Sequence, residues 1–100
     1  MSGMRILASE QVQTWLIALP PDSKRRVRAA LRALETTAGI LDIKALRGEL
    51  DGFHRLRVGH YRIIYHHGKG QTIYLDYADL RDEIYEAFRR LRALREAEDD

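Results

Sequence analysis

The sequence contains no cysteine, which excludes disulfide bonds and thiol chemistry. It has no apolar run approaching the length of about 18 residues that spans a bilayer, and its first residues lack the apolar region of a signal peptide. Proline occurs only at positions 20 and 21, so one strong helix break is expected. These absences favour one soluble domain, which we expect to act in the reducing cytoplasm.

The charge of the chain is unevenly distributed. The formal net charge is +2, but residues 96–100 carry four acidic side chains and no basic one. Residues 1–95 therefore hold 17 basic and 11 acidic side chains, a net charge of +6. A basic body favours nucleic acid or an acidic protein as the partner, and we expect residues 96–100 to form a disordered acidic tail.

Hydrophobic periodicity predicts an α+β domain over residues 1–95. We expect a helix capped by Ser9, and a second helix that Asp22 or Ser23 caps and Gly39 closes. The two helices should pack as a hairpin, and residues 40–52 read as a loop. Together with a C-terminal helix, this hairpin should pack on a mostly antiparallel four-stranded sheet. The expected strands are residues 5–8, 53–58, 61–67 and 71–78, and the last helix is expected over residues 81–95.

Three arginines are expected on one face of the central β-hairpin. The period of two along a strand places Arg55 and Arg57 on one face, with His54 on the other. A tight turn at Gly59 and His60 would bring Arg62, on the next strand, towards them. Guanidinium groups stay charged and carry five donors each, so the cluster requires anions around it.

The residues alone leave two possible sources for the negative charge around these arginines. One is the phosphate of a nucleic acid. The other is a surface ion-pair network with acidic residues of the same chain, for which Glu49, Asp51, Asp76 and Asp79 are candidates. No metal site is expected, because the adjacent histidines 66 and 67 would point to opposite faces of a strand.

The segment from Arg55 to Tyr65, with the sequence RLRVGHYRIIY, resembles the central hairpin of the RelE/ParE toxin superfamily. Two flanking segments are also similar to family motifs: Lys44 to Gly48 (KALRG) and Leu80 to Tyr85 (LRDEIY). The resemblance implies a β-α-α-β-β-β-α fold and the toxin of a type II toxin–antitoxin system, neutralised by an antitoxin. RelE-like members cleave mRNA on the ribosome by attack of the 2′-OH, without a metal or cofactor. ParE-like members instead inhibit DNA gyrase.

The resemblance also implies site residues. The basic and aromatic positions of RelE-like nucleases match Arg55, Arg57, Arg62, Arg81 and Tyr85, and Arg62 matches the residue that binds the scissile phosphate. The chain departs from that pattern in two ways. It has arginines where the RelE-like enzymes have lysines on the second strand, and His60 stands where the family commonly has aspartate.

The proton acceptor is the open question of the predicted site. Arginine is a poor base, because its pKa stays above about 12. The candidates are His54, His60, Tyr85 and Glu83; strand alternation counts against His54, and His60 lies beside the arginine cluster. Lys44 and Arg47 are expected to contact RNA. We expect a RelE-like mRNA endoribonuclease with an antitoxin, the ribosome and mRNA as partners. A ParE-like gyrase inhibitor is the main alternative, and a toxin fold that only represses together with its antitoxin is a third.

Overall fold

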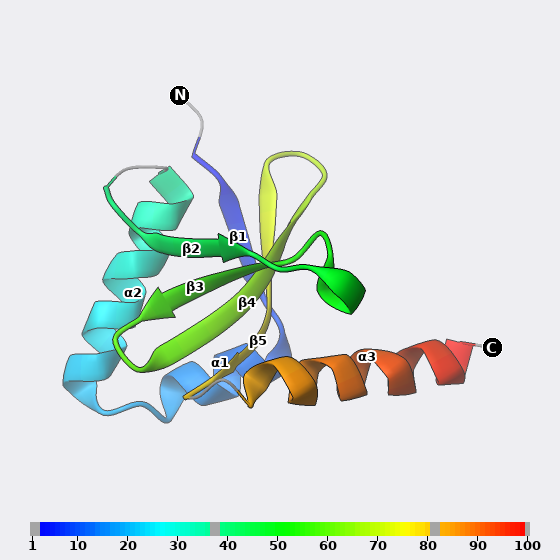
Figure 1. The fold of residues 1–100 in the computed structure, drawn as a ribbon. Helices are drawn as coiled ribbons and strands as arrows, with labels where there is room; N and C mark the ends of the chain where they lie inside the picture. Colours follow the sequence, from blue (N-terminus) through cyan, green and yellow to red (C-terminus); the bar gives the residue numbers. More distant parts are fainter. Residues whose placement is uncertain (1–2, 37–38, 81–82, 100) are drawn as a thin grey trace.

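A five-stranded sheet forms the centre of the computed structural model, which describes residues 3–36, 39–80 and 83–99 (Figure 1). The strand order is β1-β5-β4-β3-β2, and only the β1–β5 pair is parallel. The strands are β1 (Arg5–Ala8), β2 (Asp42–Ala45), β3 (His54–Val58), β4 (Tyr61–Gly68) and β5 (Thr72–Asp79). The predicted α+β class and the mostly antiparallel sheet are confirmed.

The predicted strand count of four is wrong because the segment expected as a loop contains a strand. β2 pairs with β3, and the 3-10 helix η1 (Gly48–Leu50) follows it. All four β2 residues are exposed, so the strand shows no burial pattern that its sequence could reveal. Pairing with β3, a non-local interaction, forms this edge strand.

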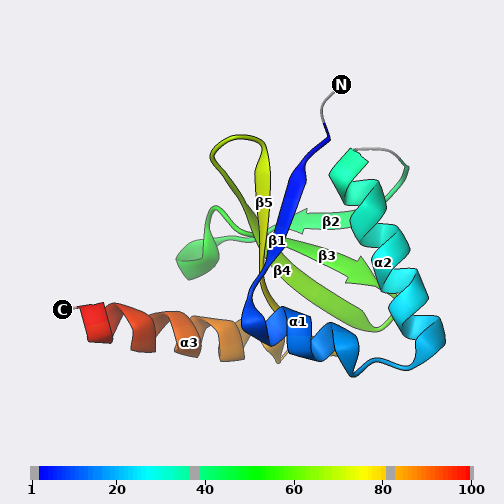
Figure 2. The same ribbon diagram turned by 180° about the vertical axis from the view of Figure 1, so that it is seen from behind.

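Two helices cover one face of the sheet, α1 (Glu10–Ile17) and α2 (Pro21–Thr36), as Figure 2 shows. Ser9 caps α1 as predicted, and its hydroxyl accepts a hydrogen bond from the backbone N–H of Val12 at 3.2 Å. The predicted start of α2 is wrong. The helix begins at Pro21, because a proline at the first helical position lacks only an N–H that would be unpaired anyway. Ser23 is buried in the first turn, where it accepts a hydrogen bond from the Tyr61 hydroxyl at 3.0 Å.

The third helix, α3 (Ile84–Asp99), extends outward from the end of β5, and its C-terminal end lies far from the sheet (Figure 1). It passes the boundary expected at residue 95, because residues 96–99, three of which are acidic, continue the helix. No helix among the described residues is long and apolar enough to cross a membrane.

The sheet separates two apolar clusters. The larger one lies under α1 and α2 and includes Val27, Leu56 and Ile63, none of which has exposed surface. The smaller one lies on the opposite face, where Phe88 of α3 packs with Ile64 and with Leu50 of η1. Figure 1 looks onto this second face, and the β2–β3 part of it is not covered by α3. We call this second face the arginine face, because the residues described next lie on it.

Candidate functional site

Two arginines lie directly opposite each other on the arginine face. In the β3–β4 register Arg57 pairs with Arg62, and the same row continues to Asp42 on β2 and Asp79 on β5. Residues directly opposite each other share a face of the sheet, and like charges in such a pair destabilise it. An anion bound between the two guanidinium groups would remove this repulsion, so the row is suited to bind an anion.

A second basic pair lies in the next row. Lys44 on β2 is opposite Arg55 on β3. Arg55 donates a hydrogen bond to Asp42 at 2.7 Å, and only 13% of its side chain is exposed. Lys44, in contrast, is exposed. Arg55 is therefore the buried and partly neutralised member of the cluster, whereas Lys44 and Arg57 present their charge to solvent.

Backbone carbonyl groups at the β3–β4 turn, and that of Leu80 directly after β5, orient the two opposed arginines. Arg57 donates from Nε to the carbonyl of Gly59 at 3.2 Å, and Arg62 donates from Nη1 to the carbonyls of His60 and Leu80 at 3.1 and 3.3 Å. Gly59 has a φ of +61°, which glycine adopts without strain. Within the described ranges, Arg57 pairs with no carboxylate. These bonds leave the positive charge of Arg57 available for an external anion.

Among the described residues, Asp42 forms an ion pair with Arg55 of the cluster, which the sequence did not indicate because the segment of Asp42 read as a loop. Two carboxylates that were candidates have other partners: Asp76 contacts His66, and Asp79 accepts a hydrogen bond from the Leu80 N–H at 2.7 Å. The structure therefore supports the predicted gathering of Arg55, Arg57 and Arg62 on one face, but with a different internal partner.

The other predicted site residues differ in their exposure. His60 is exposed in the turn, and Arg47 is exposed immediately before η1. Tyr85 is half-buried in the first turn of α3 and packs against the smaller apolar cluster. Glu83 is exposed, and its carbonyl accepts a hydrogen bond from the Ala87 N–H at 3.1 Å. Arg81 lies outside the described residues.

A histidine–aspartate pair on the same face was not predicted. His66 Nδ1 lies 2.7 Å from a carboxylate oxygen of Asp76, and the ring is stacked on Tyr74 and edge-on to Phe53. Burial raises the pKa of Asp76, and the hydrogen bond to His66 opposes this shift. Asp76 has no partner in the β4–β5 register, because it lies at the irregularity opposite Ile64 and Tyr65.

The histidine–aspartate pair does not belong to the arginine cluster. His66 lies four positions after Arg62 along β4, which corresponds to about 13 Å. Among the described residues, no group of three or more His, Cys, Asp or Glu could hold a metal ion.

His54 lies on the opposite face of the sheet, as predicted, and makes stability sensitive to acid. It is stacked on Tyr65 and edge-on to His67, and its Nδ1 atom is buried without a hydrogen-bond partner. Burial lowers the pKa of His54 from its ordinary value of 6.5, and the charge of His67 lowers it further. The unfolded chain therefore takes up this proton at a higher pH than the folded protein does.

We expect the free energy of unfolding to fall as the pH drops below 6.5 and through the lower pKa of folded His54. Replacing His54 by glutamine should reduce this dependence, whereas the same replacement of exposed His60 should not. Urea unfolding of the three proteins above and below pH 6.5 measures the effect. Equal pH dependence in wild type and His54→Gln would show that His54 is not its source.

Comparison with solved structures identifies the fold. The RelE–RelB complex of Pyrococcus horikoshii contains a chain that matches with a TM-score of 0.66 at 28% identity, over 80% of this chain and 97% of that one. The RelB–RelE antitoxin–toxin complex of Methanococcus jannaschii gives a TM-score of 0.65 at 26% identity, over 82% and 98%. The YoeB–YefM complex of Staphylococcus aureus gives 0.60 at 17% identity, over 76% and 94%, which shows likeness of fold alone. No protein-family model and no curated protein sequence matches the chain.

The likeness covers most of both chains in each comparison. It confirms the resemblance to the RelE/ParE toxin superfamily that the hairpin sequence predicted, and it confirms the fold class. The arginine face is thus displayed on a RelE-like fold.

Proposed function

We propose that this chain is the toxin of a type II toxin–antitoxin pair and that it cleaves mRNA on the ribosome in the cytoplasm. The observation that carries the proposal is the opposed pair Arg57 and Arg62, next to Lys44 and Arg55 on an open sheet face. The phosphates of an RNA backbone are anions that such a row of basic residues would bind. The RelE-like fold supports the toxin role, because the matching chains come from toxin–antitoxin complexes.

RNA supplies its own nucleophile for this reaction. The 2′-oxygen of the nucleotide before the cut attacks the adjacent phosphorus and loses its proton to a base. The bond from phosphorus to the 5′-oxygen breaks, and that oxygen takes up a proton as it leaves. The products carry a 2′,3′-cyclic phosphate and a 5′-hydroxyl. The chain has to align the phosphate and stabilise the charge that develops on its oxygens.

The arginines are suited to the electrostatic part of the reaction. Arg62 would bind the scissile phosphate, and Arg57 would approach the same phosphate from the opposite strand. Arg55, which donates a hydrogen bond to Asp42, would contribute positive charge from the neighbouring row of the sheet. Arg81 is proposed to act with these arginines. Guanidinium groups that are already oriented need little rearrangement when the phosphorane forms.

The proton acceptor is proposed to be His60, an imidazole exposed in the turn beside Arg62. Its own carbonyl accepts a hydrogen bond from Arg62, so the turn and the phosphate-binding residue are coupled. Tyr85 is proposed to stack on a nucleotide base next to the cut, and Lys44 and Arg47 to contact flanking phosphates.

We expect induced expression of the chain to produce discrete breaks in translated mRNA, mapped by primer extension, while DNA remains intact. Untranslated RNA should be cut much less, because the ribosome would help to position the substrate. A matched culture that expresses the chain with both Arg57 and Arg62 replaced by alanine serves as the control. Intact mRNA together with broken DNA would instead identify a gyrase inhibitor of the ParE kind and reject the nuclease.

A further inference from the structure

β2 is an edge strand whose outer backbone groups pair with nothing in the part of the chain that the structure describes. It is the last strand of the sheet and bonds only to β3. A hydrogen bond of 2.9 Å from the Leu46 N–H to the Phe53 carbonyl fixes which of its groups face β3. Because bonded pairs alternate along an antiparallel ladder, the N–H and C=O groups of Ile43 and Ala45 point outward. These groups are available to another strand.

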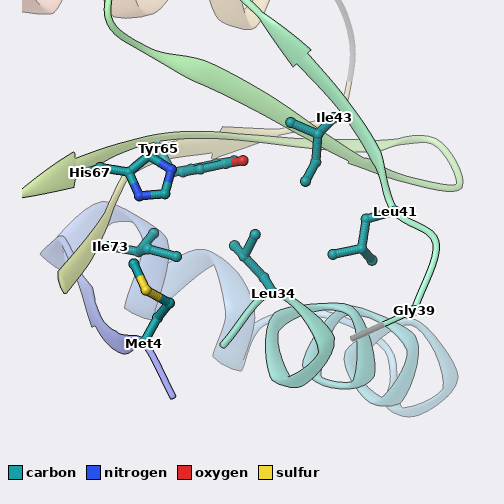
Figure 3. A pocket seen from close by; sticks show the side chains of 8 residues that line it. All are labelled: Met4, Leu34, Gly39, Leu41, Ile43, Tyr65, His67 and Ile73. Carbon is teal, nitrogen blue, oxygen red and sulfur yellow. The ribbon is translucent and has the colours of Figure 1, made fainter. Parts of the chain in front are cut away.

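One side of β2 is apolar. Leu41, Ile43 and Ala45 alternate with charged residues, so they share a side of the strand. Figure 3 shows Leu41 and Ile43 pointing the same way, towards Leu34 of α2. They line an apolar cavity of about 370 Å³ between α2 and the sheet, yet Ile43 remains 40% exposed. Away from the arginine face, β2 therefore presents an apolar strip formed by Leu41, Ile43 and Ala45.

The other side of β2 carries two unlike charges. Asp42 lies opposite Arg57 and Lys44 lies opposite Arg55, so both belong to the arginine face. The side chain of Asp42 stays 54% exposed although it pairs with Arg55, and Lys44 is also exposed. Counted outward from Ile43, the segment has the same order of charged and apolar residues in both directions, with opposite signs of charge. Such a segment is complementary to an antiparallel copy of itself.

The charges select one register for such a pair. The antiparallel registers that set the charged residues of two β2 strands against one another are centred on Asp42, Ile43 or Lys44. Centring on Asp42 or Lys44 puts two like charges directly opposite, which destabilises the pair. Centring on Ile43 puts Asp42 of each copy opposite Lys44 of the other, at non-bonded positions where Cα atoms lie about 4.5 Å apart. In this register the outward groups of Ile43 bond to their counterparts, and those of Ala45 bond to Leu41.

We propose that two copies of this chain associate through β2, antiparallel and with Ile43 on the two-fold axis. An axis that relates two antiparallel strands in this way runs perpendicular to the sheet. Both arginine faces therefore lie on the same side of the joined sheet, and the two apolar strips meet on its other side. The association does not depend on the proposed nuclease activity.

A second copy suits this edge better than other occupants do. An acidic strand would meet Asp42, a basic strand would meet Lys44, and a small molecule would leave the outward backbone groups unpaired. A lysine on an edge strand commonly keeps copies apart, but in this register Asp42 of the second copy neutralises it. The other edge strand, β1, carries only Arg5 as a charged residue, so it cannot match unlike charges with itself in this way.

Sedimentation velocity and amide hydrogen exchange of the full chain test the association. The contact between two short strands is small, so we expect a reversible dimer with a dissociation constant on the order of 100 µM. By mass action, exchange of the Ile43 amide should then be about fourfold slower at a chain concentration of about 1 mM than at about 10 µM. The amides of Asp42 and Lys44 already bond to β3, so their exchange should change little.

Charge reversal tests the register. Asp42→Lys sets lysine against lysine and Lys44→Asp sets aspartate against aspartate, so each variant should associate with itself at least about tenfold more weakly than the wild type. An equimolar mixture of the two variants should associate as the wild type does, because each opposed pair in the mixed dimer is again lysine against aspartate. A variant that has merely lost its fold would not be restored by mixing.

Ile43→Pro tests the backbone contribution separately from charge. Proline removes only an N–H that points outward, so the single chain should keep its fold, whereas self-association should weaken at least about tenfold. Ile43→Val keeps both the N–H and an apolar side chain, and as the matched control it should associate much as the wild type does.

A wild-type chain that stays monomeric at the highest concentration overturns the proposal, as does a mixture of the two folded charge-reversed chains that does not associate. Equal association of Ile43→Pro and Ile43→Val overturns it too. Protection of the Ile43 amide that appears only with a different protein bound would assign this edge to that partner and likewise reject the dimer. A chain that dimerises through β2 but cleaves no mRNA refutes the proposed activity alone.

Discussion

Replacing Arg62 by alanine is expected to lower the rate of mRNA cleavage on the ribosome by about a hundred- to thousand-fold, the usual effect of removing one charge-stabilising donor. Arg62 lies opposite Arg57, and its guanidinium group is oriented by the carbonyls of His60 and Leu80. The loss should appear in the cleavage step, because charge on the phosphate oxygens is greatest in the transition state. Single-turnover cleavage on programmed ribosomes measures it.

Two comparisons distinguish this effect from a general loss of positive charge. Arg57→Ala should show a loss of the same order, because its guanidinium group faces the same anion. Arg28→Ala removes an equal charge from an exposed position on α2, on the other side of the sheet, and should change the rate little. If Arg62→Ala and Arg28→Ala cleave at the same rate, the opposed arginines do not bind the scissile phosphate.

Replacing Phe88 by alanine is expected to lower the free energy of unfolding by about 3–5 kcal/mol, as is typical of a buried phenylalanine. Phe88 is 2% exposed, and its ring centroid lies 5.2 Å from that of Phe53 in an edge-to-face contact. Together with Ile84, it packs α3 against Ile64 of the sheet and Leu50 of η1 in the smaller cluster. Urea unfolding followed by circular dichroism gives the change.

The matched control lies on the same helix. Leu94 is 59% exposed, so Leu94→Ala should change stability by less than about 0.5 kcal/mol. A loss below about 1 kcal/mol for Phe88→Ala would mean that α3 is not held by this contact. Because Tyr85 is on the first turn of the same helix and packs against the cluster that contains Phe88, a loosened α3 should also impair cleavage.

Local patterns predicted most of the fold and the centre of the site. The alternation in β3 and the glycine turn after it predicted that Arg55, Arg57 and Arg62 share a face, and the register agrees. Strand alternation also placed His54 correctly against the other face. Such patterns depend on residues close in sequence, and the side-chain period of a strand is two wherever it forms.

The features that were missed all depend on residues far apart in sequence. β2 is exposed throughout and forms because β3 lies beside it. The pairing of Arg55 with Asp42 follows from that strand, and the contact of His66 with Asp76 follows from the pairing of β4 with β5. None of these pairs has a signature in its own segment.

The sequence by itself determined the α+β class, the basic character of the body and the hairpin that gathers three arginines, because composition and short-range periodicity are sufficient for these. Only the tertiary structure decided which carboxylate accompanies Arg55, that Arg57 faces Arg62 directly, and that an apolar pocket lies between α2 and the sheet. The reason is physical: strand register, edge exposure and cavities arise from how distant segments pack against one another.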